Sequence, residues 1–154
     1  MIKEFPLLQQ PSGSKSCLST SVRAILLWHG ESVTQSEVSA WCGENERGCW
    51  LDSAIEELRL EGFDIDDLTR SEENEIIAIA ADEDDPQPVL VTIQNSIAGL
   101  MDHAVVLLGI ETGAEGGETV FYFDPLTGAI EQDATGEFWI NWQYAGERAF
   151  ILHP

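Results

Sequence analysis

The feature that most constrains the fold of this chain is a change of pattern at Pro86. Before Pro86, apolar residues recur at helical spacing, and after it the chain consists of short β-rich runs. The expected helices cover residues 17–29, 34–41, 51–61 and 71–81, and the expected strands cover residues 89–93, 103–110, 119–124 and 148–152. Helices followed by an antiparallel sheet predict an α+β fold with segregated halves. A length of 154 residues fits one domain, so we expect a single domain over residues 1–154.

Local signals set the ends of the first two helices. Ser14 to Ser16 offer N-caps for a helix that begins at Cys17, and Gly30 can adopt the left-handed conformation that ends it. Thr34 and Glu37 match a capping box that opens the second helix. Three tryptophans in apolar-periodic contexts are expected in the core, namely Trp41, Trp50 and Trp139.

The acidic charge excludes one class of partner. Twenty-eight Asp and Glu against seven Lys and Arg give a formal net charge of −21, which makes a phosphate backbone or an anionic lipid surface a poor partner. The acids are unevenly spread: sixteen lie in residues 44–85, none lies between Phe5 and Gly30, and only Asp102 lies between Pro86 and Ile110. Burial of strands and of a core helix explains the two acid-poor stretches, and so does the need to keep acids away from a reactive thiol.

The N-terminal residues and the cysteines indicate a cytoplasmic protein. No basic region is followed by an apolar stretch, and no window approaches eighteen apolar residues, so we expect no membrane insertion. Three cysteines are too few and odd in number for a disulfide framework. Cys42 and Cys49 form no CxxC pair, which disfavours zinc, and we expect them to be buried thiols or bystanders rather than catalytic groups. We therefore predict no metal and no cofactor.

A hairpin between the second and third predicted strands brings a histidine and a carboxylate together. If its turn is centred between Gly113 and Ala114, His103 lies directly opposite Asp124. Directly opposed residues share a face of the sheet, with Cβ atoms roughly 5 Å apart, so the carboxylate can orient the imidazole. A register slip of two residues would leave a diagonal contact.

Cys17 adds a nucleophile to this pair. A thiol in the first turn of a helix lies at the positive end of the helix dipole, which favours the thiolate, and Lys15 and Arg23 act in the same direction. A cysteine at a helix start, followed downstream by a histidine and then a carboxylate, has the parts of a nucleophile, its base and the residue that orients the base.

Five motifs in order give the chain a family resemblance. They are Pro6 to Gln10, Cys17 through Trp28-His29-Gly30, His103 to Val106, Asp124 to Gly128, and Phe138 with Trp142. From residue 5 to residue 152 the chain resembles the papain-like cysteine peptidases that process bacteriocin leader peptides (double-glycine peptidases) and their free-standing relatives. The resemblance implies a papain-like fold in which the Cys17 helix packs on a C-terminal antiparallel sheet, and it implies a peptide or protein substrate.

The resemblance also implies roles for individual residues. Cys17 is the nucleophile, His103 the general base and then acid, and Asp124 the residue that orients His103. Gln10, with Gln9 as the alternative, supplies the side-chain amide of the oxyanion hole. The chain departs from the family pattern in having Leu18 after the cysteine, Asp102 before the histidine and a seven-residue spacing from Gln10 to Cys17.

Three functions follow from these residues. The first is a peptidase or amidase that acts through an acyl-enzyme on Cys17. The second is an acyltransferase in which an amine or thiol intercepts the same thioester. The third is a peptide-docking module that keeps the scaffold and has lost activity.

Overall fold

The computed structural model describes residues 1–94 and 102–154 and contains a six-stranded antiparallel sheet. The strand order is β1-β6-β2-β3-β4-β5. In chain order the elements are α1 (Cys17–Trp28), α2 (Gln35–Trp41), α3 (Leu51–Leu60), β1 (Asp64–Asp67), α4 (Glu73–Ala80), β2 (Val89–Ile93), β3 (His103–Thr112), β4 (Glu118–Asp124), β5 (Ala129–Ala134), α5 (Thr135–Tyr144) and β6 (Ala149–His153).

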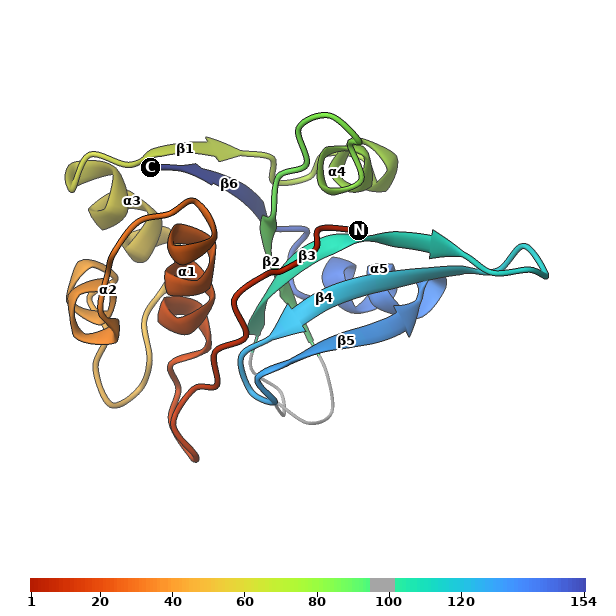
Figure 1. Ribbon diagram of the computed structural model, residues 1–154. Coiled ribbons are helices and arrows are strands. Elements are labelled where there is room, and N and C mark those ends of the chain that lie inside the picture. The colour runs from red at the N-terminus through yellow and green to blue at the C-terminus, as the bar shows by residue number, and fades with distance from the viewer. Residues whose placement is uncertain (95–101) are drawn as a thin grey trace.

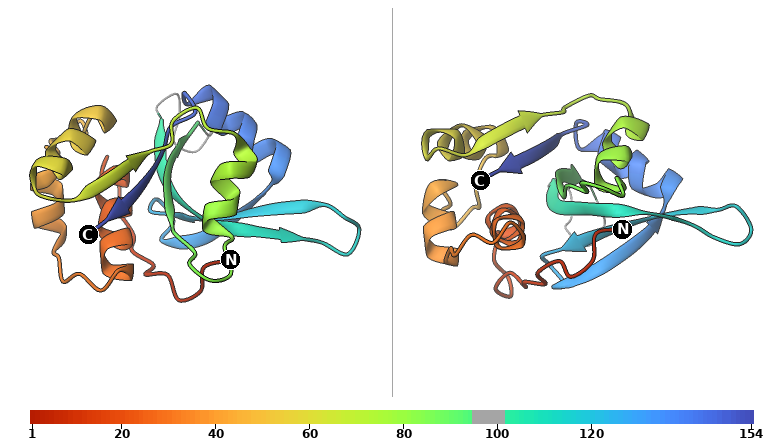
Figure 2. Two further views of the ribbon diagram at one scale, coloured as in Figure 1. Left: turned by 90° about the horizontal axis from the view of Figure 1, so that it is seen from above. Right: turned by 45° about the horizontal axis from the view of Figure 1, so that its top comes forward.

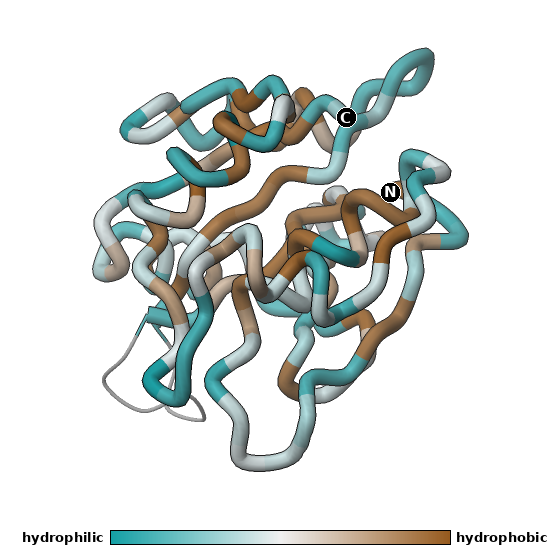
Figure 3. The backbone as a smooth tube through the Cα atoms, turned by 90° about the vertical axis from the view of Figure 1, so that its left-hand side faces the viewer, coloured by the Kyte–Doolittle hydropathy of each residue, from teal (hydrophilic) through white to brown (hydrophobic). Residues whose placement is uncertain are grey.

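Helices cover both faces of the sheet, and this explains the apolar runs of the central strands. Helices α1, α2 and α3 share one buried cluster with Leu90, Val106 and Phe150, whereas α4 and α5 share a second cluster with Val91 and Val105. Figure 1 shows the two groups of helices at opposite sides of the molecule, and Figure 2 shows the same division from above. All five residues of β2 are buried, so this strand has no polar face. In Figure 3 the apolar segments, in brown, gather toward the interior of the molecule.

The α+β class and the predicted helices are confirmed. The first two helices begin at Cys17 and Gln35, and the Thr34 hydroxyl accepts a hydrogen bond from the Glu37 amide at 3.2 Å, as the capping box predicts. All four predicted strands are present. Strands β1 and β5 and helix α5 were not predicted from the sequence.

The register of the β3–β4 hairpin differs from the prediction. Near the turn, Thr112 pairs with Glu118, so the turn is centred on Glu115 rather than between Gly113 and Ala114. A β-bulge at Leu108 then shifts the pairing by one residue, and Leu107 pairs with Tyr122. Continuing this register places Asp124 opposite Val105, so His103 and Asp124 are diagonal rather than directly opposed.

The N-terminal segment runs along the sheet and is fixed at two points. The Ile2 amide donates to the Leu108 carbonyl at 2.8 Å, and the Gln10 amide donates to the Pro125 carbonyl at 2.8 Å. In Figure 1 this segment, in red, passes between α1 and strands β3 and β4. The segment is therefore fixed to β3 and to the turn after β4 before it reaches α1.

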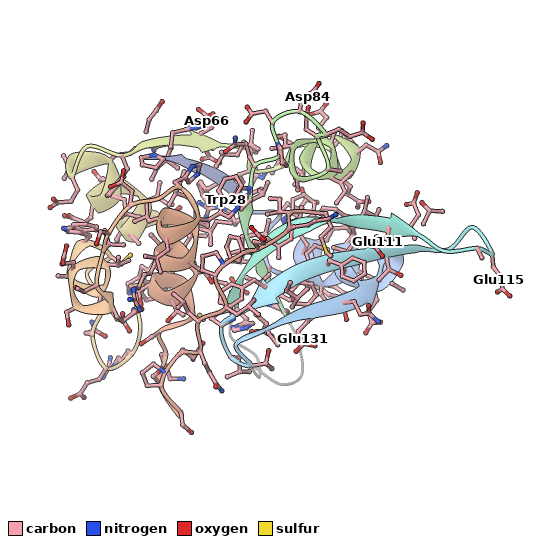
Figure 4. All side chains as sticks on the ribbon, viewed as in Figure 1. Trp28, Asp66, Asp84, Glu111, Glu115 and Glu131 are labelled. Carbon is pink, nitrogen blue, oxygen red and sulfur yellow. The ribbon has the colours of Figure 1, made fainter. Side chains whose placement is uncertain are left out.

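Many of the acids lie away from the core. The five acids labelled in Figure 4 lie on the periphery, on β1, after α4, along the β3–β4 hairpin and on β5: Asp66, Asp84, Glu111, Glu115 and Glu131. Within the described residues, no helix is long and apolar enough to cross a membrane.

Candidate active site

The thiol of Cys17 lies at the first residue of α1 and is partly exposed. Ser16 is the N-cap, but its hydroxyl does not cap the helix and instead donates to the Glu44 carboxylate. The buried Ser19 hydroxyl donates to the other oxygen of Glu44 at 2.6 Å. The start of α1 is thus held to the loop after α2. This contact also brings one carboxylate of the acid-rich segment close to Cys17, contrary to the idea that this segment is kept at a distance.

His103 and Asp124 form a buried pair. Nε2 of His103 lies 2.6 Å from Oδ1 of Asp124, and the two residues are 3% and 4% exposed. The Leu126 amide also donates to Oδ1 of Asp124, at 2.9 Å, and orients the carboxylate. Because Asp124 occupies Nε2, Nδ1 of His103 remains for Cys17.

The pairing decides the protonation state of His103. Burial lowers the pKa of His103, but the hydrogen bonds from the ring to Asp124 and to Cys17 outweigh burial and raise the pKa to about 9. At neutral pH the ring is therefore an imidazolium held between a carboxylate and a thiol. This is the form that stabilises a neighbouring thiolate.

Gln10 lies beside the turn that follows Asp124, where its backbone amide donates to the Pro125 carbonyl. Its side chain is 6% exposed, its Nε2 donates to the Ser14 carbonyl at 2.8 Å, and its Oε1 has no hydrogen-bond partner in the part of the chain that the structure describes. Gly128 approaches Gln9 so closely that a Cβ at Gly128 would lie 2.8 Å from the Gln9 Cβ. The Gln9 side chain, in contrast, is exposed and donates to the Leu126 carbonyl. The structure therefore brings Gln10, and not Gln9, into the buried part of the site.

Two cavities meet at Cys17. The larger, of about 540 Å³, extends between α1, the start of α3 and the sheet, and Thr92, Ala104 and Arg148 are among its lining residues. The smaller, of about 240 Å³, is lined by Gln10, His103 and Leu126. Four residues line both cavities: Cys17, Leu18, Cys49 and Asp102. Leu18 is 5% exposed and belongs to the core, and Asp102 is exposed.

Cys49 and Trp50 also belong to the site, although the sequence favoured a buried thiol or a bystander for Cys49 and a core position for Trp50. Cys42 is buried as expected, whereas Cys49 is only partly buried and lines both cavities. A hydrogen bond from Cys42 lowers the pKa of Cys49 against the opposing effect of burial. The expectation that Trp50 lies in the core is wrong, because Trp50 is 84% exposed at the mouth of the larger cavity. Trp139 is buried as predicted.

The described residues contain no group of three or more His, Cys, Asp or Glu side chains that could hold a metal ion. Around the two open cavities lie a thiol, a protonated imidazole, a carboxylate and an amide, which are the groups that nucleophilic catalysis by a cysteine uses.

The fold, with a cysteine at the head of a helix packed on an antiparallel sheet, is papain-like. The chain belongs to the Peptidase_C39-like family, whose model matches residues 2–150, and this membership supports a cysteine peptidase.

Two solved structures are similar over nearly the whole chain. The peptidase domain of Streptococcus ComA, a bifunctional ABC transporter of a quorum-sensing pathway, has a TM-score of 0.75 at 14% identity, covering 97% of this chain and 98% of that chain. A double-glycine-motif protease from an AMS/PCAT transporter, in complex with its leader peptide, has a TM-score of 0.71 at 18% identity, covering 97% and 91%. A comparison with curated proteins finds no significant match.

Proposed function

We propose that this chain is a peptidase or amidase that cleaves a peptide bond through an acyl-enzyme on Cys17. The observation that carries the proposal is the buried 2.6 Å contact of His103 with Asp124 beside the thiol of Cys17. Membership of the Peptidase_C39-like family supports the same reaction class. The peptide bound to the AMS/PCAT protease supports a peptide or protein substrate.

The acylation step uses the groups in the order that their geometry suggests. The Cys17 thiolate, paired with the His103 imidazolium, attacks the scissile carbonyl carbon, and the oxyanion that forms accepts hydrogen bonds from the Gln10 side-chain amide and the Cys17 backbone amide. The carbon–nitrogen bond breaks as the His103 imidazolium gives its proton to the leaving nitrogen. The product is a thioester on Cys17 and a free amine.

Deacylation returns the enzyme to its starting state. His103, now neutral, takes a proton from water, which attacks the thioester carbon and releases the Cys17 thiolate and a carboxylic acid. Asp124 holds the ring so that Nδ1 faces the sulfur throughout. Interception of the thioester by an added amine would give the acyltransferase reaction instead, and analysis of products with and without amine distinguishes the two.

The open cavities favour an enzyme over a docking module. The side chain of Leu18 packs into the core and Asp102 is exposed, so neither departure from the family pattern plugs the cleft. About 540 Å³ and 240 Å³ of space remain on the two sides of the thiol.

The test is site-resolved alkylation together with hydrolysis of a peptide library. We expect iodoacetamide at neutral pH to modify Cys17 first and to abolish hydrolysis, with the modified residue located by mass spectrometry. Cys17→Ala should remove all hydrolysis while the circular dichroism spectrum stays unchanged, because the thiol is partly exposed and lies at the margin of the core cluster. Cys49→Ser is the matched control, because Cys49 lines the same cavities. Hydrolysis that persists in Cys17→Ala, or is lost in Cys49→Ser alone, would contradict the proposal.

A further inference from the structure

The larger cavity takes the acyl side of the substrate, if the proposed function holds. The leaving nitrogen must lie beside His103, which gives it a proton. His103 lines only the smaller cavity, whereas Cys17 lines both. The residues before the scissile bond therefore extend from Cys17 into the larger cavity.

A buried hydroxyl without a partner lies in the wall of this cavity. Thr92 is 6% exposed, lines the cavity, and its Oγ1 makes no hydrogen bond with any group of residues 1–94 and 102–154. Its pairing partner on β3, Ala104, lines the cavity beside it. A buried hydroxyl without a protein partner is costly, and a polar group of a bound ligand would satisfy it.

Basic side chains concentrate around the cleft of this acidic protein. Of the seven Lys and Arg residues in the sequence, four line the two cavities: Lys15 and Arg47 in the smaller, and Arg70 and Arg148 in the larger. Only two acids, Asp52 and Asp102, line either cavity, although the chain has twenty-eight. The cleft is thus far less negative than the rest of the molecule.

Arg70 is the cation of the larger cavity that is still available for a ligand. Among the residues that the structure describes, its side chain forms no ion pair, and it is exposed at the cavity rim. Its backbone has φ +66°, which is rare for a residue other than glycine, and its amide donates to the Glu147 carbonyl at 2.9 Å. The surrounding turn therefore holds Arg70 at this place against local strain.

The other charges of the cavity already have partners. Arg148 forms an ion pair with Asp52 and donates through Nε to the Thr69 hydroxyl at 3.2 Å. Asp102 accepts a hydrogen bond from the Gln94 side chain at 3.2 Å. Among the described residues, the lining groups without a partner include a hydroxyl and a guanidinium, both of which donate hydrogen bonds.

We propose that the larger cavity recognises an acidic side chain of the substrate on the acyl side of the scissile bond, through Arg70 and the Thr92 hydroxyl. A glycine or an apolar side chain at this position leaves the Thr92 hydroxyl without a partner. A carboxylate satisfies it and pairs with the free guanidinium.

The test uses tripeptide chloromethyl ketones as probes of the acyl side. The Cys17 sulfur displaces chloride and forms a thioether, so the second-order rate constant of inactivation reports recognition without a known substrate. Each of the first two positions before the ketone is varied in turn among Glu, Gln, Leu, Lys and Gly. At one of the two positions we expect Glu to react fastest and to exceed Gly by about tenfold or more, as for one hydrogen bond to a charged group.

Two pairs of variants assign this preference to the cavity. Arg70→Gln and Thr92→Val should each reduce the Glu-to-Gly rate ratio several-fold. Lys3→Gln makes the same change of net charge outside the cavities, and Thr20→Val removes another buried hydroxyl that has no partner but does not line the cavity. Both controls should keep the wild-type ratio.

The outcomes separate this proposal from the proposed function. If no probe labels Cys17, the proposed function itself fails. If Cys17 is labelled but Lys or Leu probes react fastest, or if all four variants keep the Glu preference, the acidic subsite is refuted while the peptidase remains.

Discussion

Replacing Asp124 with asparagine tests the central pair of the site. Asparagine keeps an oxygen at the position of Oδ1, so the contacts with His103 and with the Leu126 amide can persist, but the negative charge is lost. We expect the pKa of His103 to fall from about 9 toward its ordinary value of 6.5, because burial lowers it and the main opposing interaction is gone.

The size of the effect follows from the pKa. The gap between 6.5 and about 9 corresponds to about 3 kcal/mol of differential stabilisation of the imidazolium. Because the folded protein binds this proton more tightly than the unfolded chain, the contribution is present in full below about pH 6.5 and is lost as the pH rises through about 9. Asp124→Asn should therefore destabilise the protein by up to about 3 kcal/mol at pH 6 and by much less at pH 10.

Two measurements test this expectation without a substrate. Nuclear magnetic resonance of ¹³C-labelled histidine follows the three imidazoles from pH 5 to pH 10, with each assigned by a His→Gln variant. Urea unfolding at pH 6 and pH 10 gives the free energies. Asp66→Asn is the matched control, because among the described residues Asp66 forms a second His–Asp pair, with the partly exposed His153, and pairs at the surface contribute at most about 1 kcal/mol.

The reasoning is refuted by either of two results. In wild-type protein, a titration of His103 near pH 6.5 would mean that the pair does not hold the proton. Equal destabilisation by Asp124→Asn at pH 6 and pH 10 would mean that the loss comes from packing and not from charge.

Two further variants probe the groups around the pair. Gln10→Ala should lower kcat by about 10²–10³ with little change in KM, whereas Gln9→Ala should change neither kcat nor KM by more than a few-fold. Steady-state kinetics on a cleaved library peptide measures both. Equal losses of kcat in the two variants would contradict the assignment of Gln10 to the oxyanion hole. Gly128→Ala places a Cβ 2.8 Å from the Gln9 Cβ at a backbone φ of +68°. This substitution should lower the free energy of unfolding, measured in urea, by about 1–3 kcal/mol. An unchanged midpoint of urea unfolding would mean that the turn and the Gln9 segment separate easily.

The strands that could be predicted from the sequence are the ones buried inside the sheet. Val89–Ile93 is apolar throughout because helices cover both of its faces. The two strands that were missed, Asp64–Asp67 and Ala129–Ala134, are the edges of the sheet. Edge strands have exposed positions and carry acids that discourage pairing with other chains, so their apolar pattern is weak. Helix α5 follows β5 with no intervening loop, which hides its start.

Only part of the site could be predicted from the sequence. Cys17 could be placed at a helix start because that depends on local pattern alone. The positions of Cys49, Trp50 and Thr92 in the cavity wall depend on how α3 and β2 pack near α1, and no local pattern carries that information. Trp50 illustrates the difficulty, since an apolar-periodic context normally indicates burial and here precedes a helix whose first turn borders a cavity.

The pairing of His103 with Asp124 depends on a single extra residue in β3. With the register of the hairpin end continued unbroken, Asp124 would lie opposite Val106, and His103 would point to the other face of the sheet. The bulge at Leu108 moves the register by one and returns both side chains to one face. The carbonyl of Leu108 accepts the Ile2 amide, and the same N-terminal segment is fixed to the Asp124 turn by the Gln10 amide. One segment therefore supports the bulge that aligns the His–Asp pair and also carries the amide proposed for the oxyanion hole. We expect a substitution at Ile2 to affect the site by changing the register of β3 against β4, and not through direct contact.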